Sequence, residues 1–192
     1  YLNDKLVNAT TNKIAYIPTL SSSLPWLTVK ENLELVFKIN SQKIDEELIN
    51  KVIKIVNLDG YENFIPNKNS IGFRLRISLA RAIINQPFFI LLDEPFSKLD
   101  YDTKNELYQL LKEIKNKLNI TFIIATSSIS EAIELSDKIL IFNPNNFSEM
   151  ISIDCISYFK EMKNISELNY KEQIYNRIKN LIDINFVNSF IL

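Results

Sequence analysis

The sequence predicts an α/β fold, a parallel sheet flanked by helices with an inserted α-helical subdomain. Residues 88–92 form an unbroken apolar run, which is typical of a strand buried on both faces of a parallel sheet. Residues 121–125 are β-branched and apolar and predict a second buried strand. From residue 88 onward strand patterns alternate with helical patterns, as in a parallel sheet with crossover helices. The stretch 28–84 is largely helical in pattern.

The first third of the chain predicts one short strand and two helices. Residues 13–17 alternate weakly, which favours a short strand, and residues 21–26 are expected to form a loop. Thr28 and Glu31 have the spacing of a capping box, in which two side chains satisfy two orphan amides, so a helix should follow to about residue 39. A second helix, ending near Gly60, is predicted by the apolar stripe of Leu48, Val52, Ile55 and Val56.

Two longer helices are expected on either side of the 88–93 strand. Ser70 is suited to cap the first of them, which should run to about Ile84. The second is predicted by the apolar stripe of Leu107, Leu110, Leu111, Ile114 and Leu118.

The last third predicts one more strand and a loosely ordered tail. Ser128 and Glu131 again have capping-box spacing, and residues 138–142 form the next strand pattern. A turn is expected over 143–146, because Asn-Pro-Asn-Asn favours turns. Residues 150–192 predict a tail with one helix over 166–182.

Composition excludes several classes of function. The 192 residues suffice for one sizeable core, and the net charge of −1 provides no basic field for nucleic acid. The chain contains no histidine, which excludes histidine catalysis and histidine metal ligands. The single cysteine, Cys155, excludes an internal disulfide and fits a reducing compartment. No apolar stretch approaches the roughly 20 residues that a membrane-spanning helix needs.

Two adjacent carboxylates, Asp93 and Glu94, end the 88–92 apolar run. Ligands bind at the carboxyl edge of open parallel sheets, so these side chains are the first candidates for a site. In a nucleotide hydrolase, one such acid holds Mg²⁺ through its water shell and the next polarises the attacking water. An ordinary solvated strand end is the alternative explanation of the pair.

Two longer motifs resemble one known family. Residues 88–100, Phe-Phe-Ile-Leu-Leu-Asp-Glu-Pro-Phe-Ser-Lys-Leu-Asp, resemble the Walker B motif and D-loop of the ATP-binding-cassette (ABC) ATPases. Residues 70–82 are similar to the family's signature helix, whose first turn contacts the γ-phosphate of ATP held by the opposite subunit. The resemblance implies a P-loop NTPase-like fold, with Asp93 organising Mg²⁺ and Glu94 positioning water. It also implies that Ser70, Gly72 and Asp100 face a nucleotide.

Three residues depart from the family's pattern. Ile71 replaces the first signature glycine, and its β-branched side chain restricts the backbone there. Thr19 occupies the position of the Q-loop glutamine and is too short to reach the metal and water as glutamine does. Ser127 occupies the position of the switch histidine and cannot carry positive charge. Helix capping explains Ser127 and Ser128 equally well.

The segment Leu24–Val29 is similar to the one after the Q-loop in ATPases of nitrate, sulfonate and taurine importers, which packs near the membrane subunit's coupling helix. Alternatively Pro25 and Trp26 anchor the core at a helix start, and both roles can coexist. The P-loop pattern G-x-x-x-x-G-K-[ST] is absent. Since the family places it before the Q-loop, we expect an N-terminally truncated chain.

The resemblance implies a division into four parts. Residues 1–27 are the remnant of an N-terminal β region with the Q-loop, and residues 28–84 the helical subdomain with the signature helix. Residues 85–149 are the α/β core with the Walker B, D-loop and H-loop regions, and residues 150–192 the C-terminal tail.

As a function, the resemblance implies the ATP-binding subunit of an ABC importer that uses ATP and Mg²⁺. It would form a homo- or heterodimer with another ABC ATPase and bind integral membrane permease subunits at the cytoplasmic face of the membrane, without nucleic acid. The departures predict weak or no hydrolysis, so an inactive partner subunit or a degenerate remnant is the alternative. A soluble ABC ATPase of DNA repair or translation is a third hypothesis, although the long insertions or tandem cassettes usual there are not visible.

Overall fold

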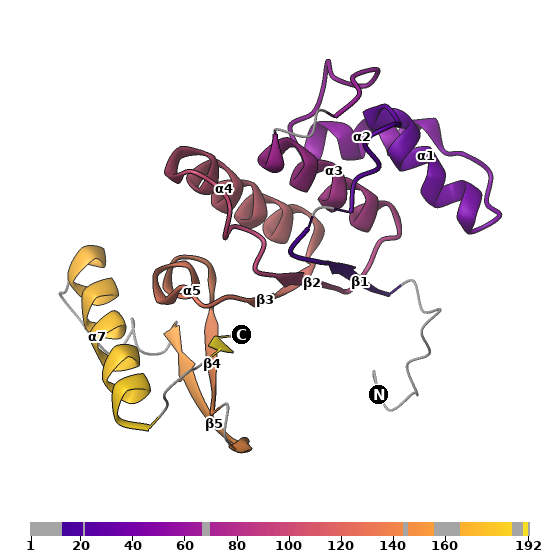
Figure 1. The fold of residues 1–192 in the computed structure, drawn as a ribbon. Coiled ribbons are helices and arrows are strands. Elements are labelled where there is room, and N and C mark those ends of the chain that lie inside the picture. The colour runs from indigo at the N-terminus through magenta and orange to yellow at the C-terminus, as the bar shows by residue number, and fades with distance from the viewer. Residues whose placement is uncertain are drawn as a thin grey trace. The chain divides into compact units, whose positions relative to one another are not determined.

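A computed structural model of the chain describes residues 13–20, 22–66, 70–143, 146–155, 166–185 and 190–191. The chain forms two compact units, residues 1–123 and residues 124–192 (Figure 1). The first unit carries most of the predicted site residues.

The first unit is built on a three-stranded sheet in the order β1-β2-β3. Strand β1 (Ile14–Ile17) pairs in parallel with β2 (Phe89–Asp93), with Ile14 opposite Phe89 and Ile17 opposite Leu92. Strand β3 (Thr121–Ala125) follows, and the Thr121 amide donates to the Phe88 carbonyl at 3.0 Å. The parallel sheet with flanking helices predicted from the sequence is therefore confirmed.

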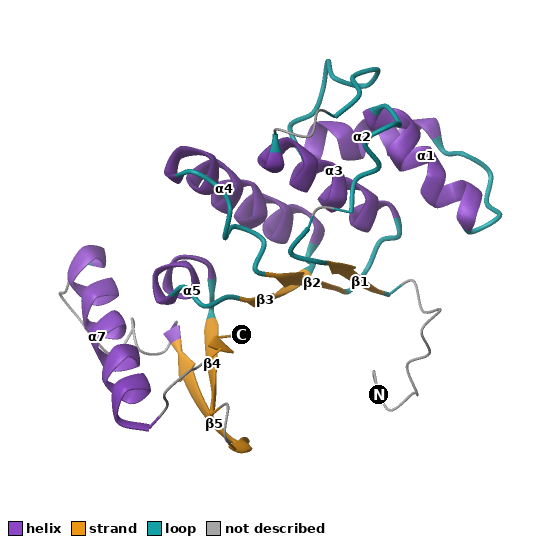
Figure 2. Cartoon of the chain, viewed as in Figure 1, coloured by secondary structure: helices purple, strands orange, loops and turns teal. Residues whose placement is uncertain are grey.

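Three helices between β1 and β2 match the predicted helical stretch (Figure 2). They are α1 (Val29–Ile39), α2 (Glu46–Ile55) and α3 (Ile71–Ile84). The Thr28–Glu31 capping box is present at the start of α1, and Ser70 caps α3. The expected end of the second helix near Gly60 is wrong, because α2 closes at Ile55 with Val56 as its C-cap and Gly60 lies in a later turn at φ +83°.

Helix α4 (Tyr101–Leu118) returns the chain from β2 to β3. Asp100 caps its start, and Asn119 ends it in the left-handed conformation at φ 53°. The predicted apolar stripe is buried at four positions, Leu107, Leu110, Leu111 and Ile114, but Leu118 in the last turn is only half-buried. The first unit's core joins this stripe to residues of α1, α2, α3 and β2, including Leu33, Ile49, Ile53, Ile77, Leu79 and Ile90.

The expected burial of β3 is wrong for the described chain. The strand lies at the edge of its sheet, none of its residues is fully buried, and Ile123 is 39% exposed. Its β-branched composition predicted the strand correctly, but composition alone does not reveal which strand is at an edge.

The second unit has its own antiparallel sheet and helices α5 (Ile129–Leu135) and α7 (Glu167–Asn185). Strand β4 (Lys138–Asn143) lies between β5 (Asn146–Asp154) and β6 (Phe190–Ile191) and is antiparallel to both. The predicted strand and helix of this region are present, but β5 and β6 were missed. The turn expected over 143–146 falls in part outside the described residues. The unit's core comprises Ala132, Ile133, Ile139, Ile141, Ile153, Cys155, Tyr170, Ile174 and Ile178.

Candidate functional site

Asp93 accepts hydrogen bonds from two hydroxyl groups at the carboxyl edge of the first sheet. The parallel register brings the end of β1 beside the end of β2, where the hydroxyls of Tyr16 and Thr19 each donate to Asp93 Oδ2 at 3.2 Å. Two of the predicted site residues, Thr19 and Asp93, are thereby in direct contact. Tyr16 was not predicted, although the pairing of β1 with β2 would have identified it.

The Tyr16 hydroxyl acts as a donor at neutral pH. Desolvation raises its pKa, and the hydrogen bond to Asp93 and the negative charge of that carboxylate raise it further. With two donors on Oδ2, the Asp93 side chain is held in one orientation.

Glu94, next to Asp93, has an unusual backbone conformation. Its φ is 45°, which L-residues other than glycine, asparagine and aspartate rarely adopt. Its carbonyl accepts hydrogen bonds from the amide of Ser97 at 3.3 Å and the hydroxyl of Ser97 at 3.0 Å. The following turn is anchored by Phe96, which is completely buried and meets the Tyr108 ring edge-on at 4.9 Å. Such locally strained residues cluster at functional sites.

The other predicted residues of the first unit line one surface pocket. Ser70, Gly72 and Asp100 surround a volume of about 330 Å³, together with the charged side chains of Arg76 and Glu106. The Ser70 hydroxyl accepts from the Phe73 amide at 3.4 Å and so caps α3. Amides in the first turn of a helix have no partner within that helix and favour anions.

Gly72 is required by packing between two helices. The glycine is buried, and a β-carbon placed on it would lie 2.6 Å from Thr103 Cγ2. The resemblance to the signature helix implied that Gly72 faces a nucleotide. The structure adds a second reason for glycine here, the close approach of α3 to the first turn of α4.

Asp100 is the N-cap of α4. Its carboxylate accepts from the Thr103 amide at 2.9 Å and from the Thr103 hydroxyl at 2.7 Å. These hydrogen bonds hold the pKa of the exposed Asp100 carboxyl below its ordinary value. Asp100 therefore carries a negative charge at the mouth of the pocket near neutral pH.

The sequence matches a family model for ABC transporters over residues 2–97, half of the chain. The chain belongs to the ABC transporter family. An uncharacterized ABC transporter ATP-binding protein of Methanocaldococcus jannaschii, MJ0412, is 33% identical over 160 residues, which are 81% of this chain and 60% of that protein. The chain thus spans about 60% of the length of this curated relative.

Solved structures of ABC proteins share the fold. The ATP-binding cassette MJ0796, solved as a post-hydrolysis dimer bound to ADP and Pi, is 29% identical with a TM-score of 0.54, over 66% of this chain and 56% of that one. The cbiO1 protein of Clostridium perfringens, part of the transporter complex cbiONQ, has a TM-score of 0.65 at 20% identity, over 88% of this chain and 68% of that one.

The segment after Thr19 is fixed to the helical part of this ABC chain. Asn32, completely buried in α1, donates to the carbonyls of Leu24 at 3.1 Å, Leu27 at 3.1 Å and Thr28 at 2.9 Å, and accepts from the Leu24 amide at 2.8 Å. The sequence analysis missed Asn32, although a polar residue between apolar ones in a predicted helix was a usable signal.

Trp26 is not a core anchor. Its side chain is 68% exposed, and Leu20 in the same region is 70% exposed. The interpretation of Pro25 and Trp26 as a packed helix start is therefore wrong for Trp26. The Asn32 hydrogen bonds hold the loop while leaving the indole at the surface.

Ser127 belongs to the second unit, and the capping explanation does not apply to it. Ser128 is the N-cap of α5 and accepts from the Glu131 amide at 3.3 Å, whereas Ser127 is exposed. In a capping box the Ser128 amide would donate to the Glu131 side chain. Here buried Thr126 connects these two groups instead. Its hydroxyl donates to the Glu131 carboxylate at 2.8 Å and accepts from the Ser128 amide at 3.1 Å.

The residues around Asp93 fit an Mg²⁺ ion that is bound together with phosphates. Carboxylate and hydroxyl oxygens are hard donors of the kind Mg²⁺ prefers. Within the described ranges, however, no three aspartate, glutamate, histidine or cysteine side chains group closely enough to hold a metal alone. In the described part of the chain, no helix is both long and apolar enough to cross a membrane.

Proposed function

We propose that this chain is part of an ATP-binding subunit of an ABC importer and acts in a dimer of such subunits. The observation that carries the proposal is the contact of Thr19 and Tyr16 with Asp93 at the sheet edge. Through this contact, Thr19 at the Q-loop position is hydrogen-bonded to the Walker B carboxylate of Asp93, as a nucleotide-dependent switch requires. The pocket around Ser70, Gly72 and Asp100 supplies a second surface for the partner subunit's nucleotide.

Each residue has a defined role in this proposal. Asp93 would hold Mg²⁺ through the water shell of the ion, and Glu94 would orient the attacking water. Ser70 and the first turn of α3 face the phosphates of a nucleotide held by the opposite subunit. When bound, ATP supplies the phosphoryl group, and Mg²⁺ neutralises its developing charge.

We propose further that hydrolysis by the chain as given is weak or absent. Thr19, Ile71 and Ser127 each replace a family residue directed at the phosphates or the water, and losing one such donor commonly costs about 10²–10³ in rate. No ATPase activity is therefore expected from the purified chain. Turnover that disappears in the Glu94→Gln variant would refute the expectation and assign full enzyme activity to the chain.

An inactive partner subunit is the second candidate function. The close approach of Thr103 to Gly72 favours it, because this packing of α3 against α4 gives the glycine a role that needs no nucleotide. A working partner should co-purify with a complete ABC ATPase and change its turnover. A degenerate remnant should do neither.

The importer assignment and the location at the inner face of the membrane rest on the Leu24–Val29 segment. Leu20 and Trp26 are large apolar side chains exposed on this segment and its neighbour, as expected of a surface that meets a permease. Among the relatives, cbiO1 is part of a transporter complex. Co-purification with permease subunits should be lost in Trp26→Glu and retained in the control Tyr101→Glu, which alters a 78% exposed aromatic residue elsewhere.

A further inference from the structure

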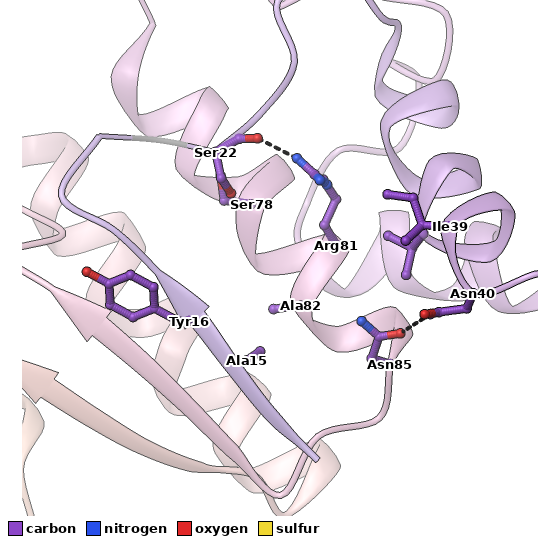
Figure 3. A pocket seen from close by; sticks show the side chains of 10 residues that line it. Ala15, Tyr16, Ser22, Ile39, Asn40, Ser78, Arg81, Ala82 and Asn85 are labelled. Atoms are coloured by element: carbon purple, nitrogen blue, oxygen red, sulfur yellow. Dashed lines mark hydrogen bonds between the residues drawn. The ribbon is translucent and has the colours of Figure 1, made fainter. Parts of the chain in front are cut away.

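A second pocket, of about 250 Å³, lies between β1, α1 and α3, and Tyr16, which also contacts Asp93, is one of the residues that line it (Figure 3). Its walls combine apolar side chains, Val36, Ile39 and Ala82, with the polar side chains of Arg81, Asn40 and Asn85. A volume of this size suits a molecule of only a few non-hydrogen atoms.

Arg81 brings positive charge to this pocket without a matching anion. Its Nη1 donates to the carbonyl of Ser22, while its Nε is buried and has no hydrogen-bond partner among the described residues. No aspartate or glutamate is among the pocket-lining residues. Burial lowers the pKa of the guanidinium, but arginine remains protonated in proteins. A partly buried cation is stabilised by an anionic partner, and the described residues that line this pocket provide none.

Two asparagines also line the pocket. Asn40 Nδ2 donates to Asn85 Oδ1 at 3.0 Å (Figure 3). This hydrogen bond to the Asn85 oxygen also fixes the position of the Asn85 amide nitrogen. Both residues are C-caps, Asn40 of α1 and Asn85 of α3. Helix C-termini carry partial negative charge, which disfavours a doubly charged anion such as phosphate more than a singly charged one.

We propose that this pocket binds a small monocarboxylate with a short apolar stem. The carboxylate pairs with the Arg81 guanidinium and accepts from the Asn85 amide, while the stem packs against Val36 and Ile39. The carboxylate can belong to a free acid or to a glutamate side chain of another molecule. The inference does not depend on the proposed nucleotide function.

The test is an NMR titration of the full chain with butanoate and, separately, with N-acetyl-glutamate amide. Butyramide, of the same shape without charge, and inorganic phosphate are the ligand controls. Saturable shifts of the Arg81 Nε–H and Asn85 side-chain signals are expected with a carboxylate. The carboxylate that binds more tightly shows whether the natural ligand is a free acid or a glutamate side chain. Butyramide and phosphate should bind at least about tenfold more weakly than that carboxylate.

Variants separate this site from general anion binding. Arg81→Gln should weaken carboxylate binding about tenfold or more, and Asn85→Ala should weaken it less. Arg76→Gln is the matched control on the same helix, because Arg76 bonds to Glu106 and the Val56 carbonyl instead, and it should bind as the parent does. The proposal is overturned if neither carboxylate gives saturable shifts in the parent chain, if butyramide or phosphate binds equally well, or if Arg81→Gln and Asn85→Ala, both folded, bind unchanged.

Discussion

Four hydrogen bonds to the buried side chain of Asn32 hold the loop that presents Trp26. Serine, threonine and asparagine in a helix often bond to nearby backbone, and here the bonded backbone lies just before the helix. The structure thereby explains how an exposed tryptophan can sit on an ordered segment.

Replacing Asn32 by alanine should destabilise the chain by about 2–3 kcal/mol, because the part-buried Leu24 amide and Leu27 carbonyl lose the partner that the Asn32 side chain provides. The measurement is urea unfolding, with the emission of Trp26, the only tryptophan, as a local probe. Asn116→Ala is the control, since Asn116 is exposed on α4 and should change stability by less than about 0.5 kcal/mol. Equal effects of the two substitutions would contradict the assigned role.

A methyl group at Gly72 should destabilise the chain although alanine favours helices. The new Cβ would meet Thr103 Cγ2, and overpacking of this kind costs about 1–3 kcal/mol. Thr103→Ser removes that methyl group and keeps the hydroxyl, so the double variant Gly72→Ala/Thr103→Ser should recover most of the loss. Thermal unfolding of the single and double variants tests this, and failure of the second change to rescue would show that the contact is not the cause.

At the residue scale, the sequence predicted which residues belong to the candidate site better than it predicted which residues they contact. Asp93 and Ser70 were singled out because a strand end and a helix start are visible in sequence, whereas Asp100 was singled out through the resemblance to the D-loop. Tyr16 and Thr126 were missed, because their partners depend on strand register and on a buried loop.

The N-cap of α4 makes stability depend on pH. Thr103 donates twice to Asp100 and holds its folded pKa below the ordinary value of 3.8. The unfolded chain lacks these bonds, so the contribution is complete above pH 3.8 and is lost as the pH falls through the lower folded value.

Titration of the Asp100 carboxyl carbon by NMR should give a pKa below 3.8. Thr103→Val removes one donor and should raise this pKa toward its ordinary value, whereas Thr103→Ser keeps both donors and should leave it low. A pKa that is unaffected by Thr103→Val would mean that the hydroxyl contributes nothing.

Element boundaries followed local chemistry closely where a cap was present. Thr28, Ser70 and Asp100 mark the starts of α1, α3 and α4, since each has a side chain that accepts from the first turn. Strand pairing was harder to predict from the sequence. The antiparallel pairing of β4 with β5 and the exposed edge of β3 depend on neighbours far apart in sequence.

At the scale of the whole molecule, the second unit is held by a core that includes the fully buried Ile174 and Ile178 of α7. The sequence predicted a loosely ordered tail with one helix for residues 150–192. The Tyr170 hydroxyl also donates to the Cys155 carbonyl at 2.6 Å, which fixes α7 beside the end of β5.

Ile174→Ala should destabilise this unit by about 2–5 kcal/mol. Cys155, the only cysteine, is buried, so its rate of reaction with a thiol reagent reports opening of the unit. The rate should rise in Ile174→Ala and stay unchanged in Leu168→Ala, where the side chain is 78% exposed on the same helix. Equal rates in the two variants would contradict a core at Ile174.

Association with a complete ABC ATPase tests the central claim most directly. The chain is mixed with an ABC ATPase that has an intact P-loop and a Walker B glutamate changed to glutamine, and the complex is measured by light scattering with and without ATP and Mg²⁺. We predict a one-to-one complex that needs ATP, weakens at least about tenfold in Ser70→Arg and persists in the control Ser130→Arg, which changes an exposed residue of α5. A complex that is indifferent to ATP or to Ser70→Arg, or no complex at all, would contradict the claim.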